Sequence, residues 1–450
     1  MINEDSVLEQ QSKTSSRDVT ISVKHLTRVE GHGNISVNVK DGEITQLELA
    51  IVESPRFFEA FLRGRPWNEA PHITCRICGI CSVGHTTASF HAMEAACGIQ
   101  VTPQTDRLRK LILMGEELQS HWLHLYFLAV PDYLGVGSVI PLAGSHPEVV
   151  QRALRMKKLA NDICSVVGGR HIHPIAIHVG GVTHFPKHED LLGLKERLIA
   201  SREDLKEMVG LFGTLSVPSF ERDTEYLSLK DVGGGEYAFY DGDIVSTKDP
   251  SPTPVAEYRE RVIEDVVPHS AAKHCRTPMS ETYAVGALAR FNNNYEQLHP
   301  EARRVAEDLG LQAICMNPFH NNTAQLIETV HCVERAIELI DELVTIGVRP
   351  EPLVKPTSFG RGAGAAEVPR GVLFHEYGVD RNGMIEMANL IIPTGQNLAN
   401  IEADMRALVP QLLDEGMDKD AITLRLEMLV RAYDPCISCA THLLDVLWVD

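Results

Sequence analysis

Hydrophobic and polar positions alternate through residues 19–52, which is the pattern of half-buried β-strands. The pair Asp41-Gly42 divides this stretch and predicts a hairpin turn between two strands. From about residue 105 to residue 128, apolar residues recur at helical spacing, which predicts a long and largely buried helix. Further helical patterns run through about 146–167, 189–213, 298–311, 323–346 and 419–432.

Two later stretches carry strand and turn signals, one at about 214–250 and the other at about 367–392 around Asp380 to Gly383. No internal repeat, low-complexity tract or clean linker separates the parts of the chain. The pattern therefore predicts an α+β fold that is mostly helical, with small β pieces at its edges, as a single domain over residues 19–442.

The composition, with 44% hydrophobic and 23% charged residues among 450, is that of a globular protein with a substantial core. A net charge of −19 argues against nucleic acid or an anionic membrane surface as a partner. No window approaches the roughly 18 consecutive apolar residues of a membrane span. Residues 1–18 are polar and mixed in charge, so we expect a disordered tail rather than an export signal, which favours a cytoplasmic protein.

Four of the ten cysteines form two C-x-x-C pairs, a spacing that lets two thiolates reach one metal ion. Cys78 and Cys81 lie in RICGICSVGH, and Cys436 and Cys439 lie in DPCISCATH, about 355 residues later. Thiolates select zinc, copper(I), nickel or an iron–sulfur cluster. Structural zinc pairs usually stand about 15–20 residues apart, and iron–sulfur cysteines cluster in short runs. The wide gap favours a catalytic metal site and leaves zinc and iron–sulfur open.

The motifs around both pairs resemble those of the large, catalytic subunit of nickel–iron hydrogenases, over about residues 20–442. The family's two signatures, R-x-C-G-x-C-x-x-x-H and D-P-C-x-x-C-x-x-H, are present without a substitution. Four further motifs stand between them in the family's order: RVEGHG (28–33), PRFFEAFLRGR (55–65), EVPRGVLF (367–374) and NLIIPTGQN (389–397). The resemblance implies that family's large-subunit fold, with a central helix bundle and small peripheral β pieces.

The resemblance implies a nickel ion bound by all four cysteines. Cys81 and Cys439 would also bridge to an iron that carries carbonyl and cyanide ligands, whereas Cys78 and Cys436 would be terminal on nickel. Heterolytic cleavage of H2 needs a base beside the metals, and the resemblance implies that Cys436 is this base. Glu30 matches the family's first proton-relay residue, although a glutamate in a strand-like run is more often a solvated face residue.

Arg370 matches the family arginine that stands over the gap between iron and nickel, and Asp434 matches the acid that orients it. Several respiratory members carry a second aspartate where this chain has Ser120, so we expect no clamp of two carboxylates on the arginine. Pro369 and Thr394 match positions that line the pocket around the diatomic ligands, with Thr394 able to donate a hydrogen bond.

Two further sites are implied by the resemblance. His85 would donate a hydrogen bond toward the bridging sulfur of Cys81 and so tune the metal site. A separate hard-cation site, for magnesium or iron, would be formed by Glu59, the carbonyl group of Leu390 and His442.

The resemblance implies a bidirectional hydrogenase, H2 ⇌ 2 H⁺ + 2 e⁻, that passes electrons to a small subunit bearing iron–sulfur clusters. The segments ESPRFFEA, EDVVPHSAAKH and LVRAYDPCISCATH are most similar to the NAD(P)-linked group, which includes the sulfhydrogenases and whose diaphorase subunits carry flavin. Groups linked to heterodisulfide reductase or to a deazaflavin coenzyme are alternatives. A structural zinc protein and a non-catalytic relative from a respiratory complex are alternatives of other classes. Residues 443–450 would be removed by a maturation protease after nickel-insertion proteins have loaded the site.

Three other features of the sequence superficially suggest metal or nucleotide binding. The histidine-rich segment 168–188 fits no tight ligand spacing, and we expect a structural role for it. The glycine-rich segment FGRGAGAAEVPRG lacks the preceding strand, helix start and downstream acid of a dinucleotide fingerprint. The remaining cysteines are expected to be core thiols, with Cys75 alone close enough to a ligand to compete for metal.

Overall fold

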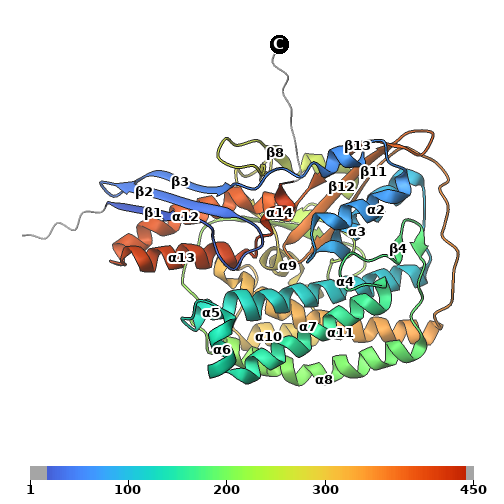
Figure 1. Ribbon diagram of the computed structural model, residues 1–450, viewed down its shortest axis with the longest axis horizontal. Helices are drawn as coiled ribbons and strands as arrows, with labels where there is room; N and C mark the ends of the chain where they lie inside the picture. Colours follow the sequence, from blue (N-terminus) through green and yellow to red (C-terminus); the bar gives the residue numbers. More distant parts are fainter. Residues whose placement is uncertain (1–17, 442–450) are drawn as a thin grey trace, which may run out of the picture.

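The structure is a computed structural model that describes residues 18–441. The expected tail therefore lies outside the described residues except for Asp18, as do His442 and the expected extension 443–450. A bundle of long helices lies along one side of the molecule, and small two- and three-stranded sheets lie on the other (Figure 1). This arrangement confirms the predicted α+β class, which is mostly helical.

The helices are α1 (Phe58–Leu62), α2 (Ala70–Thr74), α3 (Ser82–Cys97), α4 (Pro103–Leu123), α5 (Val130–Tyr133), α6 (Val139–Ser145), α7 (Pro147–Gly168), α8 (His188–Gly213), α9 (Ala287–Asn294), α10 (Pro300–Asp308), α11 (Asn321–Ile346), α12 (Pro393–Asp414), α13 (Lys419–Ala432) and α14 (Ile437–Ala440). The strands are β1 (Val19–Val23), β2 (Gly33–Lys40), β3 (Glu43–Ile51), β4 (Ile177–His178), β5 (Gly181–Val182), β6 (Glu225–Lys230), β7 (Asp243–Ser246), β8 (Ile263–Asp265), β9 (His274–Arg276), β10 (Tyr283–Ala284), β11 (Arg361–Val368), β12 (Gly371–Val379) and β13 (Ile385–Ile391).

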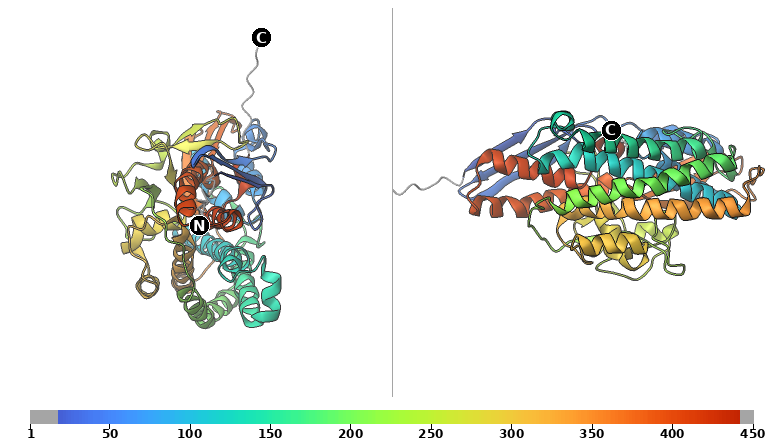
Figure 2. Two further views of the ribbon diagram at one scale, coloured as in Figure 1. Left: turned by 90° about the vertical axis from the view of Figure 1, so that its left-hand side faces the viewer. Right: turned by 90° about the horizontal axis from the view of Figure 1, so that it is seen from below.

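The bundle is built from α4, α7, α8 and α11, whose long helices run along the length of the molecule (Figure 2). Helix α4 packs against α7 and α11, and α11 also packs against α8. Helix α4 begins where the Thr102 side chain accepts a hydrogen bond from the Thr105 amide, with Pro103 at the first helical position. Gly169 follows the last residue of α7 and caps the helix with a φ of 75°, which suits glycine. The predictions of helices near 146–167, 189–213 and 323–346 are confirmed.

The helix predicted over 105–128 changes its winding before it ends. The α-helical part stops at Leu123, and His124–Ala129 form a π-helical turn. Such turns widen the helix and occur often at functional sites. Here the imidazole of His124 lies between two other elements, with Nδ1 2.6 Å from Gln325 Oε1 and Nε2 2.8 Å from the Arg431 carbonyl oxygen.

The N-terminal sheet has the predicted hairpin, with β1, β2 and β3 in antiparallel order. Asp41 and Gly42 form its turn with φ values of 53° and 82°. The sheet lies beside the C-terminal helices α12 and α13, so the two ends of the described chain meet (Figure 1).

The stretch predicted at 367–392 is a hairpin of β12 and β13, and β11 pairs with the outer side of β12. Sequence patterning did not predict β11, because it is rich in glycine and alanine rather than in β-branched residues. The glycines allow close packing. A Cβ atom at Gly362 or Gly364 would collide with the backbone of α3, against which the strand lies.

Helices α3 and α12 were not predicted either. Almost every residue of α3 is buried, so this helix lacks the polar face from which periodicity is recognised. Helix α12 likewise buries both apolar residues and polar ones such as Gln396, Asn397 and Asn400. Among residues 18–441, no helix is long and apolar enough to cross a membrane.

Candidate metal centre

Four cysteine sulfurs from opposite ends of the chain converge in the interior. Cys78 and Cys81 precede α3, with Cys81 immediately before its first residue, whereas Cys436 immediately precedes α14 and Cys439 lies within it. One sulfur from each residue lies within 4.8 Å of the others. The four residues are exposed by only 6%, 3%, 1% and 1%, in chain order. A buried cluster of four sulfur donors fits a soft metal ion.

The sulfurs are arranged in two cross-chain contacts. Cys78 Sγ lies 3.4 Å from Cys436 Sγ, and Cys81 Sγ lies 3.8 Å from Cys439 Sγ. The first cysteine of each motif thus faces the first of the other motif, and the second faces the second. In addition, Cys436 and Cys439 are joined as a disulfide, so binding of one metal by four thiolates requires this pair to be reduced.

Two backbone connections hold the ends of the chain together at the centre. Glu30 pairs with Cys436 as an isolated parallel bridge, and the Ile437 amide donates to the Glu30 carbonyl oxygen at 2.9 Å. Gly31 has a φ of 85°, and a Cβ atom there would lie 2.8 Å from the Cβ of Ile437. Glycine is therefore required at position 31 both for its conformation and for the close approach of the two segments.

Arg56 forms a second connection, which sequence reasoning did not single out. Its amide donates to the Thr441 carbonyl oxygen at 2.6 Å. Its guanidinium Nη2 donates to the Ile77 carbonyl oxygen at 2.7 Å and also to the Ser438 carbonyl oxygen. One arginine therefore fixes the backbone beside both cysteine pairs. The motif PRFFE contained the residue but gave no sign of these long-range partners.

The two cysteines of the first motif differ in acidity. A hydrogen bond from the Cys81 thiol lowers the pKa of Cys78 to about 7, with the nearby Arg370 charge acting in the same direction against burial. The corresponding hydrogen bond, together with burial, raises the pKa of Cys81. Without a bound metal, Cys78 is therefore the first of this pair to become a thiolate, which is the form that binds metals.

Arg370 is almost completely buried beside the sulfurs, and its partners come from two elements. Nη2 donates to Asp434 Oδ1 at 2.9 Å, and Nε donates to the Asp434 carbonyl oxygen at 2.6 Å. Asp434 has a left-handed φ of 49°, so both of these oxygens reach the same guanidinium. Burial disfavours the charge on Arg370, but Asp434 and the two nearest cysteines outweigh it and raise the pKa of the guanidinium.

The third contact of Arg370 is made with Ser120, whose Oγ lies 3.4 Å from Nη1. Among the described residues, Asp434 is the one carboxylate in an ion pair with this arginine. This agrees with the expectation that serine at this position does not supply a second carboxylate. The positive charge is therefore less neutralised than a two-carboxylate clamp would leave it.

Glu30 and Thr394 both contact Cys436. Glu30 Oε2 lies 3.2 Å from Cys436 Sγ and accepts a hydrogen bond from the Ser438 amide at 3.0 Å. Thr394 Oγ1 accepts from the Cys436 amide at 3.0 Å, a contact that does not use its own hydroxyl proton. Pro369 immediately precedes Arg370, and its carbonyl oxygen accepts from Arg290 Nη2 at 3.3 Å.

His85 belongs to a buried polar chain. Its Nδ1 lies 3.3 Å from His375 Nε2, and His375 Nδ1 lies 2.8 Å from the Tyr377 hydroxyl. Ser89 Oγ lies 2.9 Å from the same hydroxyl. The partner histidine stands on β12, 290 residues away in sequence, so no local pattern could have predicted the pair. A hydrogen bond from His85 to the sulfur of Cys81 stays a prediction.

Two of the three residues expected at the hard-cation site lie together. Glu59 Oε1 accepts from the Leu390 amide at 2.8 Å and from Asn389 Nδ2 at 3.4 Å. Both Glu59 and Leu390 are buried. His442, the third expected ligand, lies outside the described residues.

An ion-pair network beside α4 was not predicted from the sequence. Arg290 is fully buried, and its Nε and Nη2 each lie 2.7 Å from an oxygen of Glu328. Its Nη1 lies 3.0 Å from Glu367 Oε2, and His121 Nε2 lies 2.9 Å from Glu328 Oε2. The arginine lowers the pKa of Glu328 to about 2 against the opposing effect of burial. Because both Glu328 oxygens bind the guanidinium, this cluster is an ion-pair network rather than a metal site.

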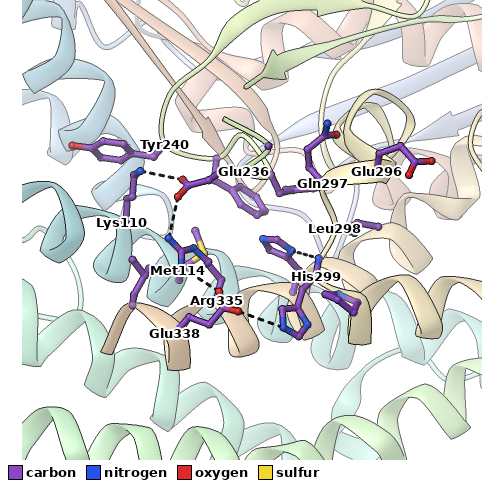
Figure 3. Close-up of a pocket in the computed structure, with 16 residues that line it drawn as sticks. Lys110, Met114, Glu236, Tyr240, Glu296, Gln297, Leu298, His299, Arg335 and Glu338 are labelled. Atoms are coloured by element: carbon purple, nitrogen blue, oxygen red, sulfur yellow. Dashed lines mark hydrogen bonds and ion pairs between the residues drawn. The ribbon is translucent and has the colours of Figure 1, made fainter. Parts of the chain in front are cut away.

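A surface cavity of about 380 Å³ lies next to this network and does not include any of the four motif cysteines in its lining (Figure 3). Its rim carries linked charges, with Lys110 and Arg335 each 3.0 Å from an oxygen of Glu236. Tyr237 lines the cavity, and its hydroxyl donates to Glu328 Oε1 at 2.7 Å. The cavity is therefore a polar surface feature that is separate from the cysteine centre.

The histidine-rich segment 168–188 contributes hydrogen bonds and forms no metal-ligand cluster within the described part of the chain. His178 Nδ1 lies 3.2 Å from His72 Nε2, and His173 Nδ1 lies 2.8 Å from the Cys75 carbonyl oxygen. Burial raises the pKa of Cys75 to about 11, and its thiol donates to the His72 carbonyl oxygen. A thiol of such low acidity is a poor competitor for the metal.

The chain is similar to known proteins over nearly its whole length. Residues 56–146 and 236–442 match the family model described as nickel-dependent hydrogenase, and residues 20–54 match one described as HoxL-like. The alpha chain of sulfhydrogenase 1 from Pyrococcus furiosus is 34% identical over 424 residues, which cover 94% of this chain and 97% of that protein. A chain of the F420-non-reducing hydrogenase from Methanothermobacter marburgensis is 33% identical over 463 residues, with 95% of each protein covered.

Among solved structures, a NAD+-reducing NiFe hydrogenase in its H2-reduced state superposes with a TM-score of 0.85 and 28% identity. The match covers 94% of this chain and 99% of that one. A NiFeSe hydrogenase from Desulfovibrio vulgaris Hildenborough in its reduced state superposes with a TM-score of 0.77 and 24% identity, and this likeness bears on the fold alone.

Proposed function

The chain belongs to the nickel-dependent hydrogenase family as a catalytic large subunit, and we propose that it works as a bidirectional, NAD(P)-linked hydrogenase in the cytoplasm. The observation that carries this proposal is the convergence of four buried cysteine sulfurs from the two ends of the chain. The reaction is H2 ⇌ 2 H⁺ + 2 e⁻. A structural zinc protein would also use four cysteines, but it would not need a buried acid, a buried arginine and a carboxylate around them.

Cys78, Cys81, Cys436 and Cys439 would hold the nickel. By the resemblance of the two motifs, Cys81 and Cys439 would also hold the iron, whereas Cys78 and Cys436 would hold nickel alone. When bound, the nickel–iron group supplies the site at which H2 is split heterolytically and its electrons are taken up. Carbonyl and cyanide ligands would complete the iron, because only two protein sulfurs reach it.

Arg370, Pro369 and Thr394 would surround the diatomic ligands and the substrate. The Arg370 guanidinium is held rigidly by Asp434, and a fixed positive charge in a dry site acts more strongly than one in water. Thr394 Oγ1 accepts a hydrogen bond from the Cys436 amide, so its hydroxyl proton is available to a ligand in the pocket. His85 would tune the bridging sulfur from its buried polar chain.

Protons would leave through Cys436 and Glu30. As a thiolate, the Cys436 sulfur takes a proton, and Glu30 Oε2 stands 3.2 Å away to receive it. The Ser438 amide, which also donates to Oε2, fixes the carboxylate in this position. The step therefore needs no movement of the backbone.

A magnesium or iron ion would bind beside Glu59 and the Leu390 carbonyl group, with His442 as a further ligand. We also propose that residues 443–450 are removed after His442 once nickel-insertion proteins have loaded the centre. The support for both is the sequence motif ending at His442. Intact mass of the nickel-loaded protein tests the cleavage, and a chain that ends at Asp450 would contradict it.

We propose that electrons pass to a small subunit with iron–sulfur clusters and then through flavin-bearing diaphorase subunits to NAD(P). The support is the similarity to a NAD+-reducing hydrogenase and to the alpha chain of a sulfhydrogenase. The similarity to F420-non-reducing hydrogenases keeps the heterodisulfide-reductase route as the second candidate. The test is to purify the complex under anaerobic conditions, identify its component chains and assay H2-dependent reduction of NAD+ and NADP+. Absence of both flavin and nucleotide reduction in an H2-active complex would reject the NAD(P) route.

A further inference from the structure

Two histidines and a glutamate from separate elements meet beside the middle of α12. His269 lies in the loop after β8, His274 begins β9, and Glu402 stands in the middle of α12. One ligand atom from each residue lies within 4.8 Å of the others. His269 Nε2 lies 2.8 Å from Glu402 Oε1, and the two imidazole rings meet edge to face with centroids 5.4 Å apart.

His274 has an unusual environment for an imidazole. Its side chain is buried, with 7% of the residue exposed, and within the described chain its Nε2 atom has no hydrogen-bond partner. A buried polar atom without a partner costs free energy unless a ligand or water satisfies it. Burial, reinforced by the neighbouring His269, lowers the pKa of His274 to about 4, so the ring is neutral at physiological pH. A neutral imidazole is the form that binds metal ions.

The cluster also has an opening to solvent and a fixed carboxylate. The side chains of His269 and Glu402 are 23% and 17% exposed, so an ion can enter from the surface. Glu402 Oε1 accepts a hydrogen bond from the Leu49 amide at 2.8 Å, which orients the carboxylate from the β3 side. Metal-binding carboxylates commonly have such a second hydrogen bond.

We propose that His269, His274 and Glu402 form a binding site for a divalent transition-metal ion, with zinc as the best fit to the donor set. Two imidazole nitrogens and one carboxylate form a borderline donor set, which favours zinc and the later first-row metals over magnesium or calcium. Water would complete the coordination on the exposed side.

The site would act as a structural clamp on α12. It joins the loop before β9, strand β9 itself and α12, and the Ala271 amide already donates to the Ile51 carbonyl oxygen of β3 at 2.9 Å. Thr394, which binds the Cys436 amide, lies eight residues before Glu402 on the same helix, a rise of about 12 Å. An ion at the clamp would therefore hold the helix that positions Cys436 without touching the cysteine centre.

The test compares zinc retention by the wild-type complex with that of His269→Gln and Glu402→Gln. The glutamine at 402 keeps an oxygen for the Leu49 amide but loses the charge that attracts the ion. His188→Gln, at an exposed histidine that begins α8, is the matched control. Each complex is incubated with zinc chloride, dialysed against a weak chelator and analysed for zinc, and the zinc X-ray absorption edge identifies the neighbouring atoms.

We expect the wild type and the control to retain one more zinc ion per chain than either site variant, with nitrogen and oxygen neighbours. Zinc should also raise the melting temperature of the wild type but not that of Glu402→Gln. Equal zinc retention by all four proteins, or sulfur neighbours around the ion lost from the variants, would overturn the proposal. Because the nickel content of the cysteine centre is measured in the same samples, failure of this site is distinguishable from failure of the proposed function.

Discussion

Replacing Glu30 with glutamine removes the group that we propose as the first proton acceptor while leaving its surroundings in place. Glu30 Oε2 lies 3.2 Å from the Cys436 sulfur and accepts a hydrogen bond from the Ser438 amide at 3.0 Å. The amide oxygen of glutamine still accepts from Ser438, but glutamine cannot take up a proton at physiological pH. The change therefore separates proton transfer from the architecture of the C-terminal motif.

We expect Glu30→Gln to have a small effect on stability and a large effect on H2 turnover. Exchanging a charge-assisted hydrogen bond for a neutral one costs about 1 kcal/mol of stability, which leaves the fold and the metals intact. A positioned acid–base group contributes about 10²- to 10⁴-fold to a rate, so H2 turnover should fall by at least about 100-fold. Exchange between D2 and solvent protons should fall with it, because both need the proton to leave.

The assay measures dye-linked H2 oxidation, D2–H⁺ exchange, and nickel and iron content in the same anaerobic preparations. Glu53→Gln is the matched control, since Glu53 lies nearby and accepts a hydrogen bond from the His32 amide at 2.9 Å. We expect wild-type turnover from the control. Wild-type exchange by Glu30→Gln with intact metals would refute the relay, and equal losses in both variants would show that the effect is merely local disruption.

Three further predictions concern the stability of the scaffold. Arg290→Met leaves Glu328 and Glu367 buried without their cation and should destabilise the fold by about 3–5 kcal/mol, measured by urea unfolding. A loss below about 1 kcal/mol would contradict this and would show that water solvates the two carboxylates in the variant. The pKa of Glu328 is about 2 in the folded protein and about 4.3 in the unfolded chain, which contributes roughly 3 kcal/mol to the free energy of unfolding. This contribution is present above about pH 4.3 and is lost as pH falls toward 2. Glu328→Gln should therefore weaken the dependence of stability on pH in this range, and an unchanged dependence would contradict the shift. Gly364→Ala should destabilise the fold by more than about 1 kcal/mol, because the added Cβ would collide with the backbone of α3. Gly193→Ala lies in open space within α8 and should be neutral or stabilising by up to about 1 kcal/mol. Equal melting temperatures for these two variants would refute the packing argument.

The sequence predicted several helices and strands that have one buried face and one face toward solvent. The strands on either side of Asp41-Gly42 and helix α7 alternate between core and solvent, so their periodicity identifies them. Helix α3 and strand β11 pack against each other through small residues and lack that alternation. Their identity is decided by tertiary packing, which single-sequence patterns do not carry.

In the candidate centre, too, some residues could be predicted from the sequence and others could not. The two C-x-x-C motifs marked the four sulfurs, and the structure brings these together with Glu30, Arg370, Asp434 and Thr394. The contacts of Arg56 with Ser438 and of His85 with His375 join residues hundreds of positions apart in the sequence. Such contacts depend on the folded topology, so residue spacing could not predict them.

We propose that all four cysteines hold a nickel ion with an iron beside it. The most direct measurement is nickel-edge X-ray absorption with metal analysis of the anaerobically purified complex, for the wild type and for Cys436→Ser. We expect equimolar nickel and iron, sulfur neighbours around nickel in the wild type, and loss of both nickel and H2 turnover in the variant. Zinc in place of nickel with four sulfur neighbours, or undiminished H2 turnover by Cys436→Ser, would contradict it.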